Sequence, residues 1–253
     1  MTQPSVVARG AAVHYPIVLT GAQQSLLAGL ANTMSAGRFA KGAGNTEYVA
    51  GVQNVNLEIK AGERVGLIGR NGAGKSTMLR LLAGVLPPSR GSLQVKGTST
   101  NILQLGSGMD ADLTGFENIE RMSRLLEIPK SEWARVKADV EEFTELGRFL
   151  ALPLRTYSSG MSLRLGFAMA TAYPRDILVI DEVIGAGDMF FMNKAIERIK
   201  SYTEQAKILV LATHGYGALE AFCNRAIFME AGKIRADGDV KEVWQAYNDR
   251  GSV

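Results

Sequence analysis

The stretch Gly69-Arg-Asn-Gly-Ala-Gly-Lys-Ser-Thr77 decides the fold of this 253-residue chain. It matches the pattern G-x-x-x-x-G-K-[ST], whose glycines let several backbone N–H groups converge on one anion. The apolar residues of 63–68 predict a buried strand before it, and the apolar spacing of residues 75–86 predicts a helix after it. A strand, a glycine-rich loop and a helix N-terminus in this order are typical of a phosphate loop (residues 69–77).

We expect the phosphate loop to hold the phosphates of a nucleotide. Lys75 is expected to reach the β- and γ-phosphates, and the Ser76 hydroxyl suits Mg²⁺. The helix that begins at Lys75 adds the positive end of its dipole. The loop residues predicted to contact the nucleotide are Gly69, Asn71, Gly72, Ala73, Gly74, Lys75, Ser76 and Thr77.

A second motif is the apolar run of residues 177–180, which ends in Asp181 and Glu182. Such a run predicts a buried strand whose carboxyl end lies beside the phosphate loop in a parallel sheet. We therefore expect Asp181 to hold Mg²⁺ and Glu182 to act as the general base that polarises the attacking water. The motif is weak alone, because many strands end in Asp, and it gains weight from the phosphate loop.

The order of predicted strands and helices along the rest of the chain predicts an α/β protein. Short apolar strands over 176–181, 207–212 and 225–229 alternate with helical stretches, which favours a mainly parallel sheet covered on both faces. Residues 115–150 read as helical, with Ser131 as an N-cap, and a final hairpin turns at Ala231-Gly232. Residues 1–47 are the least regular, with a weak amphipathic helix over 25–34. That helix packs on its own domain or docks on a partner or membrane, and the sequence leaves both open.

The composition of the chain excludes several classes of protein and of binding site. The chain has 28 Lys and Arg against 25 Asp and Glu, a net charge of +3, and no basic run, so no nucleic-acid partner is expected. The single cysteine, Cys223, excludes an internal disulfide and a multi-cysteine zinc site. No apolar stretch reaches the length of a membrane helix and no signal-peptide pattern is present, so we expect a cytosolic chain that reaches a membrane only through a partner.

A third motif, Tyr157-Ser-Ser-Gly-Met161, is the signature segment (residues 157–161), and it precedes a helix. Gly185-Ala-Gly-Asp188 follows the acidic pair, and His214 follows a later strand. The order of these motifs over roughly residues 48–240 resembles the ATPase subunits of ABC transporters. The strings Gly66-Leu-Ile-Gly-Arg-Asn-Gly-Ala-Gly-Lys-Ser-Thr77, Leu103-Gln-Leu-Gly-Ser-Gly-Met109 and Leu113-Thr-Gly-Phe-Glu-Asn-Ile119 look like those of bacterial polysaccharide exporters for O-antigen, teichoic acid or capsule.

This resemblance implies a P-loop NTPase of the ABC type: a mainly parallel sheet, an antiparallel β edge and an inserted helical subdomain. It implies one domain over 1–253, with an N-terminal strand and extension in 1–47. The nucleotide-binding core would take 48–105 and 173–253, and the helical subdomain with the signature segment 106–172. The alternatives are a soluble ABC ATPase acting on ribosomes or DNA, and the ATPase of an importer or of a lipid or drug transporter.

The resemblance also assigns roles. ATP would lie between two copies, so that Ser158, Ser159, Gly160 and Met161 of one chain face the γ-phosphate held by Lys75 of the other. His214 would contact the γ-phosphate and orient the attacking water. The remaining assignments are Gln104 sensing Mg²⁺ and the γ-phosphate, Tyr48 stacking on adenine, and Asp188 following the acidic pair.

The expected partners are a second copy of the chain and a separate integral-membrane permease, expected in two copies, that handles the polysaccharide or lipid-linked glycan. The region from Gln104 to about Met122 is expected to dock the permease. This places the chain at the cytoplasmic face of the cell membrane.

Overall fold

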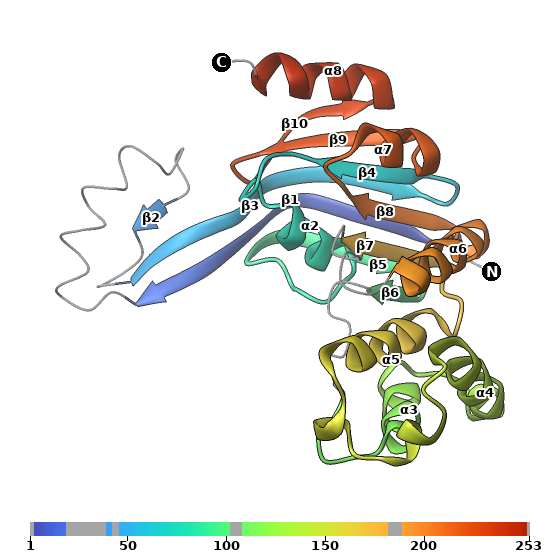
Figure 1. Cartoon of the computed structure of the whole chain (residues 1–253). Coiled ribbons are helices and arrows are strands. Elements are labelled where there is room, and N and C mark those ends of the chain that lie inside the picture. The colour runs from blue at the N-terminus through green and yellow to red at the C-terminus, as the bar shows by residue number, and fades with distance from the viewer. Residues whose placement is uncertain (1–2, 19–38, 42–45, 102–107, 182–188, 252–253) are drawn as a thin grey trace.

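The structure is a computed structural model of the chain, and it describes residues 3–18, 39–41, 46–101, 108–181 and 189–251. Two sheets form the body, two long strands extend from it, and a group of helices lies beside it (Figure 1). No helix in the described ranges is both long and apolar enough to cross a membrane.

The first sheet is antiparallel and has four strands in the order β2-β3-β1-β5. They are β1 (Ser5–Val18), β2 (Phe39–Lys41), β3 (Thr46–Lys60) and β5 (Arg90–Lys96). Residues 1–47 were expected to carry an N-terminal strand within their least regular part, and β1 is a long strand there that pairs with β3 along its whole length. Pairing with a distant strand satisfies the backbone of β1 even where its own apolar pattern is weak. The helix predicted over 25–34 lies outside the described residues.

The second sheet has six strands in the order β10-β9-β4-β8-β7-β6. All neighbours are parallel except β9 and β10, which form the predicted hairpin. The strands are β4 (Arg64–Ile68), β6 (Ser99–Asn101), β7 (Ile177–Asp181), β8 (Ile208–Ala212), β9 (Arg225–Glu230) and β10 (Lys233–Gly238). This confirms the mainly parallel sheet with an antiparallel β edge.

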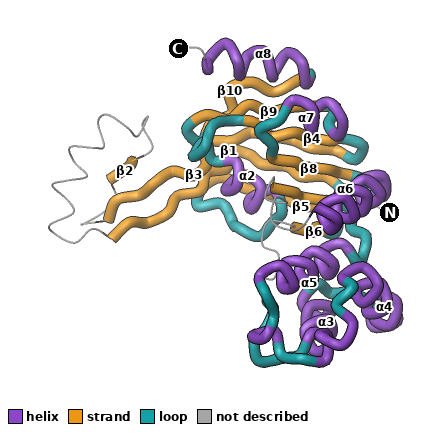
Figure 2. The backbone as a smooth tube through the Cα atoms, viewed as in Figure 1, coloured by secondary structure: helices purple, strands orange, loops and turns teal. Residues whose placement is uncertain are grey.

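Helix α2 (Lys75–Leu82) packs against strands of both sheets. Its side chains Met78, Leu79, Leu81 and Leu82 are fully buried, and each such burial contributes roughly 1.5–3 kcal/mol. The helix is predicted to reach residue 86 but ends at Leu82, because Gly84 takes a left-handed φ of 75° and turns the chain away. Helices α6 (Met189–Gln205), α7 (Tyr216–Phe222) and α8 (Val240–Gly251) pack around the second sheet (Figure 2).

Beside the sheets lie α3 (Gly115–Leu125), α4 (Trp133–Thr144) and α5 (Ser159–Thr171). Phe143 of α4, Phe167 of α5 and Phe191 of α6 contact one another with ring centroids 5.6 to 5.9 Å apart. The predicted helical stretch 115–150 is interrupted at Glu127 and Glu145, which have left-handed φ angles. Ser131 is not an N-cap, because it lies inside a 3-10 turn (Lys130–Glu132) that leads into α4.

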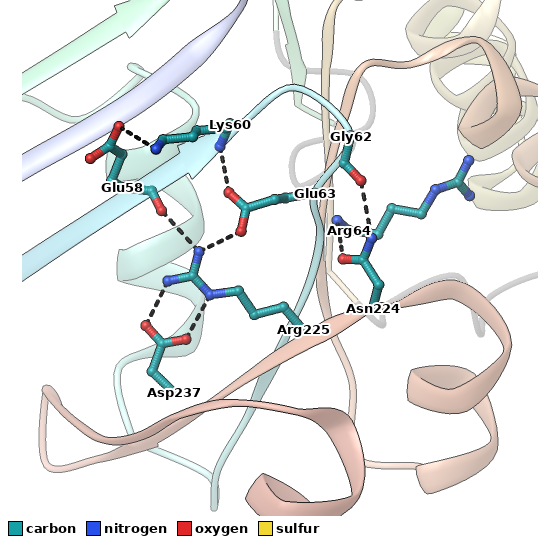
Figure 3. Close-up of polar contacts among 8 residues, drawn as sticks. All are labelled: Glu58, Lys60, Gly62, Glu63, Arg64, Asn224, Arg225 and Asp237. Atoms are coloured by element: carbon teal, nitrogen blue, oxygen red, sulfur yellow. Dashed lines mark hydrogen bonds and ion pairs between the residues drawn. The ribbon is translucent and has the colours of Figure 1, made fainter.

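A polar network at the amino end of β4 ties strands from both sheets together (Figure 3). The Arg225 guanidinium donates twice to Asp237 at 2.7 Å, once to Glu63 at 2.7 Å and once to the carbonyl of Glu58 at 2.9 Å. The hydrogen bonds to Asp237, followed by that to Glu63, raise the pKa of Arg225 above its ordinary value. Asn224 adds a link from Gly62 across the same edge. The network lies at the edge of the sheet opposite to the phosphate loop.

Candidate functional site

The phosphate loop joins the carboxyl end of β4 to the first turn of α2. Gly74 caps the helix with a φ of 105°, an angle that residues with a side chain rarely adopt. A Cβ at this position would lie 2.4 Å from the carbonyl oxygen of Gly51 on β3. Glycine is therefore required here both for the backbone angle and for the close approach of β3.

Lys75 folds back over the phosphate loop. Its Nζ donates to the carbonyl of Gly69 at 2.6 Å and to that of Arg70 at 3.4 Å, and it lies 3.3 Å from Nε2 of His214. The residue is only 9% exposed. An anion in the phosphate loop would form stronger, charge-assisted hydrogen bonds with this ammonium than the neutral carbonyls do.

The acidic strand meets the phosphate loop as the sequence predicts. Ser76 Oγ donates to Oδ2 of Asp181 at 2.8 Å. Asp181 ends β7, and His214 follows the end of the adjacent parallel strand β8. Because parallel strands end at one edge of a sheet, residues far apart in sequence reach the same place.

A cavity of about 590 Å³ opens over these groups. The phosphate loop, the end of β7, the residue His214 after β8, and residues of β1 and β3 all contribute to its lining. Its lining residues are Tyr15, Val49, Ala50, Gly51, Asn71, Gly72, Ala73, Gly74, Lys75, Ser76, Thr77, Asp181 and His214. Anion-binding groups and an aromatic ring in one cavity suit a nucleotide.

Among the described residues, the aromatic side chain that lines the cavity belongs to Tyr15 and not to Tyr48, the residue expected to stack on adenine. Tyr48 pairs with Pro16 on β1 and is not among the lining residues. The Tyr15 hydroxyl lies 3.3 Å from Oγ1 of Thr77, and a Cβ on Gly51 would lie 2.8 Å from the Tyr15 ring. Counting residues back from Lys75 missed Tyr15, because the strand that carries it pairs with β3 and its position depends on the register of that pair.

The signature segment lies apart from the cavity of its own chain. Ser158 caps α5, and its Oγ accepts a hydrogen bond from the N–H of Met161 at 3.2 Å. Ser159, Gly160 and Met161 form the first turn of α5, and none of them lines the cavity. Three predicted site residues, Gln104, Glu182 and Asp188, lie outside the described residues.

The pair of Ser76 and Asp181 offers a hydroxyl and a carboxylate, the oxygen ligands that Mg²⁺ prefers. Within the described ranges, no group of three His, Cys, Asp or Glu residues has metal-binding geometry. A Mg²⁺ held by this pair would take its remaining ligands from water and phosphate oxygens, as is usual for this ion.

Comparisons with known proteins agree on the kind of protein. The family profile described as ABC transporter matches residues 52–185. The chain is 41% identical to the O-antigen export system ATP-binding protein RfbE of Yersinia enterocolitica, over 91% of this chain and 96% of that protein. It is 36% identical to the teichoic acids export ATP-binding protein TagH of Bacillus anthracis and 39% identical to the O-antigen export system ATP-binding protein RfbB of Myxococcus xanthus. These matches cover 80% and 81% of this chain but only 37% and 47% of those proteins.

Solved structures support the fold. An ATP-binding subunit of an ABC transporter superimposes with a TM-score of 0.70 at 20% identity, over 99% of this chain and 95% of that chain. A dimeric ATP-binding cassette in a post-hydrolysis state, bound to ADP and Pi, gives a TM-score of 0.67 at 21% identity, over 93% and 98% of the two chains. The chain therefore belongs to the ABC transporter family, as one of its ATP-binding, ATP-hydrolysing subunits.

Proposed function

We propose that this chain hydrolyses ATP to power a membrane exporter of a bacterial cell-surface polysaccharide, working as a homodimer with a separate permease. The observation that carries the ATPase part is the cavity in which Lys75, the Ser76–Asp181 pair and His214 meet. The choice of cargo is supported by the names of RfbE, TagH and RfbB, and by the 96% of RfbE that the chain covers.

In this proposal ATP lies along the cavity with its phosphates on the N–H groups of the phosphate loop. Lys75 leaves the carbonyls of Gly69 and Arg70 for the β- and γ-phosphates, and Tyr15 stacks on adenine in place of Tyr48. Ser76 and Asp181, joined by Gln104, hold Mg²⁺. The ion, when bound, neutralises charge that develops on the transferred phosphoryl group.

Hydrolysis needs a base and an orienting group. Glu182 directly follows Asp181 at the end of β7, so we assign it the role of general base for water. His214, 3.3 Å from Lys75 Nζ, is assigned to contact the γ-phosphate and orient the water. Asp188 is assigned to the nucleotide contacts made across the dimer.

A second copy is needed because the signature segment does not line the cavity of its own chain. Residues 158–161 stand at the N-terminus of α5, where the positive end of the helix dipole favours an anion. In a head-to-tail pair, the signature segment of one copy closes on the γ-phosphate bound by the other. The helical subdomain over 106–172 carries this segment, and 48–105 with 173–253 form the core.

The permease is proposed to dock on α3. A surface groove there is lined by Leu113, Glu117, Glu120, Arg121, Arg124 and Leu125, and Leu125 is 57% exposed. It overlaps the region expected from the sequence to meet the permease. In such a contact Leu125 would supply apolar area to the core and the surrounding charged residues would supply the polar rim. Docking here would hold the chain at the cytoplasmic face of the membrane.

The test measures ATPase activity and ATP-dependent dimerisation of the purified chain by light scattering. Glu182→Gln should hydrolyse slowly and accumulate a dimer with ATP, whereas Lys75→Ala should bind little ATP. Glu242→Gln, on the exposed face of α8, serves as the matched control and should behave as the wild type. A Glu182→Gln protein that stays monomeric with ATP and hydrolyses it normally would contradict both the assigned base and the closed dimer.

Cargo is tested separately in the source organism. Deleting the gene should remove a polysaccharide from the cell surface and leave the polymer or its precursor inside, and Lys75→Ala should not restore export. Unchanged surface polysaccharide in the deletion strain would contradict the export proposal, while leaving the ATPase assignment intact.

A further inference from the structure

The hairpin turn between β9 and β10 lies against the phosphate loop, although it is more than 150 residues away in sequence. Strand β9 runs parallel to β4, with Phe228 opposite Ile68, so both strands end at the same edge of the sheet. After β4 comes the phosphate loop, and after β9 comes the two-residue turn Ala231-Gly232. The turn therefore lies beside the phosphate loop at this edge of the sheet.

Hydrogen bonds fix this turn from two sides. The N–H of Gly232 donates to the carbonyl of Ala73 in the phosphate loop at 2.8 Å. On the other side, the N–H of Gln53 on β3 donates to the carbonyl of Gly232 at 2.7 Å. The side chain of Gln53 adds a third bond, because its Nε2 donates to the carbonyl of Ala231 at 2.8 Å. The turn is thus a bridge from β3 to the loop.

The packing at this bridge is backbone on backbone. A Cβ on Gly232 would lie 2.9 Å from the carbonyl oxygen of Gly51, and a Cβ on Gly74 would lie 3.3 Å from the Cα of Gly232. Gly232 also has a left-handed φ of 77°. Ala231 keeps a φ of 48°, which is unfavourable for alanine, so the surrounding bonds hold the turn in this shape.

The contact with Ala73 controls a group that faces the nucleotide. A trans peptide is planar, so the C=O of Ala73 and the N–H of Gly74 point in opposite directions. Holding the carbonyl against Gly232 on one side aims the N–H of Gly74 toward the other side. An N–H that is already oriented binds a phosphate without the cost of ordering it.

We propose that the turn Ala231-Gly232, held by Gln53, is a backbone buttress that sets the orientation of the phosphate loop for nucleotide binding. Gly232 and Gln53 are positioning residues: they act on the nucleotide only through Ala73 and Gly74. This inference rests on the proposed assignment of the phosphate loop as the nucleotide site.

The matched variants are Gly232→Ala and Gly62→Ala. Gly62 also has a left-handed φ, of 93°, but a Cβ there meets nothing within 4 Å, and it lies at the opposite edge of the sheet. Both substitutions therefore introduce backbone strain, and only that at Gly232 forces the turn away from β3 and the loop. A third variant, Gln53→Met, removes the Nε2 donor and keeps the length of the side chain.

The experiment titrates the purified chain with mant-ATP, a fluorescent ATP, displaces it with ATP or ADP, and records the melting temperature of each nucleotide-free variant. Gly232→Ala should weaken the binding of ATP and ADP about tenfold or more, because a small displacement of oriented N–H donors is costly. Gln53→Met should weaken both by about threefold, since one of three hydrogen bonds is lost. Gly62→Ala should bind both nucleotides as the wild type does, even if its melting temperature falls.

The outcomes separate this inference from the proposed function. If Gly232→Ala and Gln53→Met melt lower but bind ATP like the wild type, the turn is only structural and the buttress is refuted. If Gly232→Ala does not fold, the dissociation constant of Gln53→Met alone decides. A folded wild type that binds neither mant-ATP nor ATP would instead overturn the proposed nucleotide site.

Discussion

Replacing Arg225 by Met tests how much the network in Figure 3 stabilises the body of the protein. Methionine keeps most of the side-chain volume but removes all four donations, three of them at 2.7 Å to the carboxylates of Asp237 and Glu63. The guanidinium side chain is 23% exposed and each carboxylate is 29% exposed, so water only partly screens the loss.

The expected loss in the free energy of unfolding follows from this intermediate exposure of the side chains. Removing one partner of a fully buried ion pair costs roughly 3–5 kcal/mol, and removing a fully exposed pair roughly 0.2–1 kcal/mol. With exposures below a third, we expect Arg225→Met to lower the free energy of unfolding by about 2–3 kcal/mol, nearer the buried case. For a chain of this length that corresponds to a fall in melting temperature of roughly 4–12 °C.

The assay is chemical denaturation followed by circular dichroism, with thermal unfolding beside it. The matched control is Arg235→Met on β10, where a 3.0 Å pair with Glu230 joins side chains that are 37% and 45% exposed. Arg235→Met should lower the free energy of unfolding by less than about 1 kcal/mol. ATP affinity should be unchanged in both, because the network lies at the far edge of the sheet. An Arg225→Met loss no larger than that of Arg235→Met would refute the reasoning.

Three further predictions concern other buried or paired groups. Asn118 is fully buried, and its side chain donates to the carbonyls of Asp110, Leu113 and Thr114, so Asn118→Ala should cost about 2–4 kcal/mol in denaturant titration. The hydrogen bond from Lys207, followed by that from the Thr98 backbone, lowers the pKa of Asp176 below its ordinary value of 3.8, so its contribution is present above that pH and lost as the pH falls further. The stability gap between wild type and Asp176→Asn, measured from pH 7 into the acid range, should therefore narrow as the pH falls below 3.8. Burial raises the pKa of the Cys223 thiol to about 12, so iodoacetamide at pH 8 should label the folded chain about 100-fold or more slowly than the unfolded chain, as read by mass spectrometry.

The site residues that sequence patterns predicted are those whose neighbours in sequence also set their place. Lys75 and Ser76 follow a strand and begin a helix, so the motif itself fixes their position. Asp181 was predictable because it ends a strand whose carboxyl end lies beside the phosphate loop in a parallel sheet, whereas His214 was predicted from the resemblance to ABC transporter ATPases and follows the neighbouring parallel strand. The helix breaks at Glu127 and Glu145 were missed, because neither residue type marks a left-handed angle.

Tyr15 illustrates how the register between two strands decides which side chains line the cavity. Tyr15 and Tyr48 lie on adjacent antiparallel strands, opposite Val49 and Pro16, and only Tyr15 lines the cavity. Register shifts between Ala8 and His14 alter which side chains of β1 share a face, and sequence spacing does not record them. A rule that counts residues back from Lys75 therefore selects a tyrosine that does not line the cavity.

The sequence by itself determined the phosphate loop, the acidic strand, the parallel sheet and the family, because each depends on short contiguous patterns with a local physical cause. Only the tertiary structure decided that Tyr15 borders the cavity, that Arg225 joins strands of both sheets, and that Gly232 holds the carbonyl of Ala73. Each of these contacts joins segments that chain folding alone brings together. The distances that matter there are set by strand register and backbone packing, which no local spacing encodes.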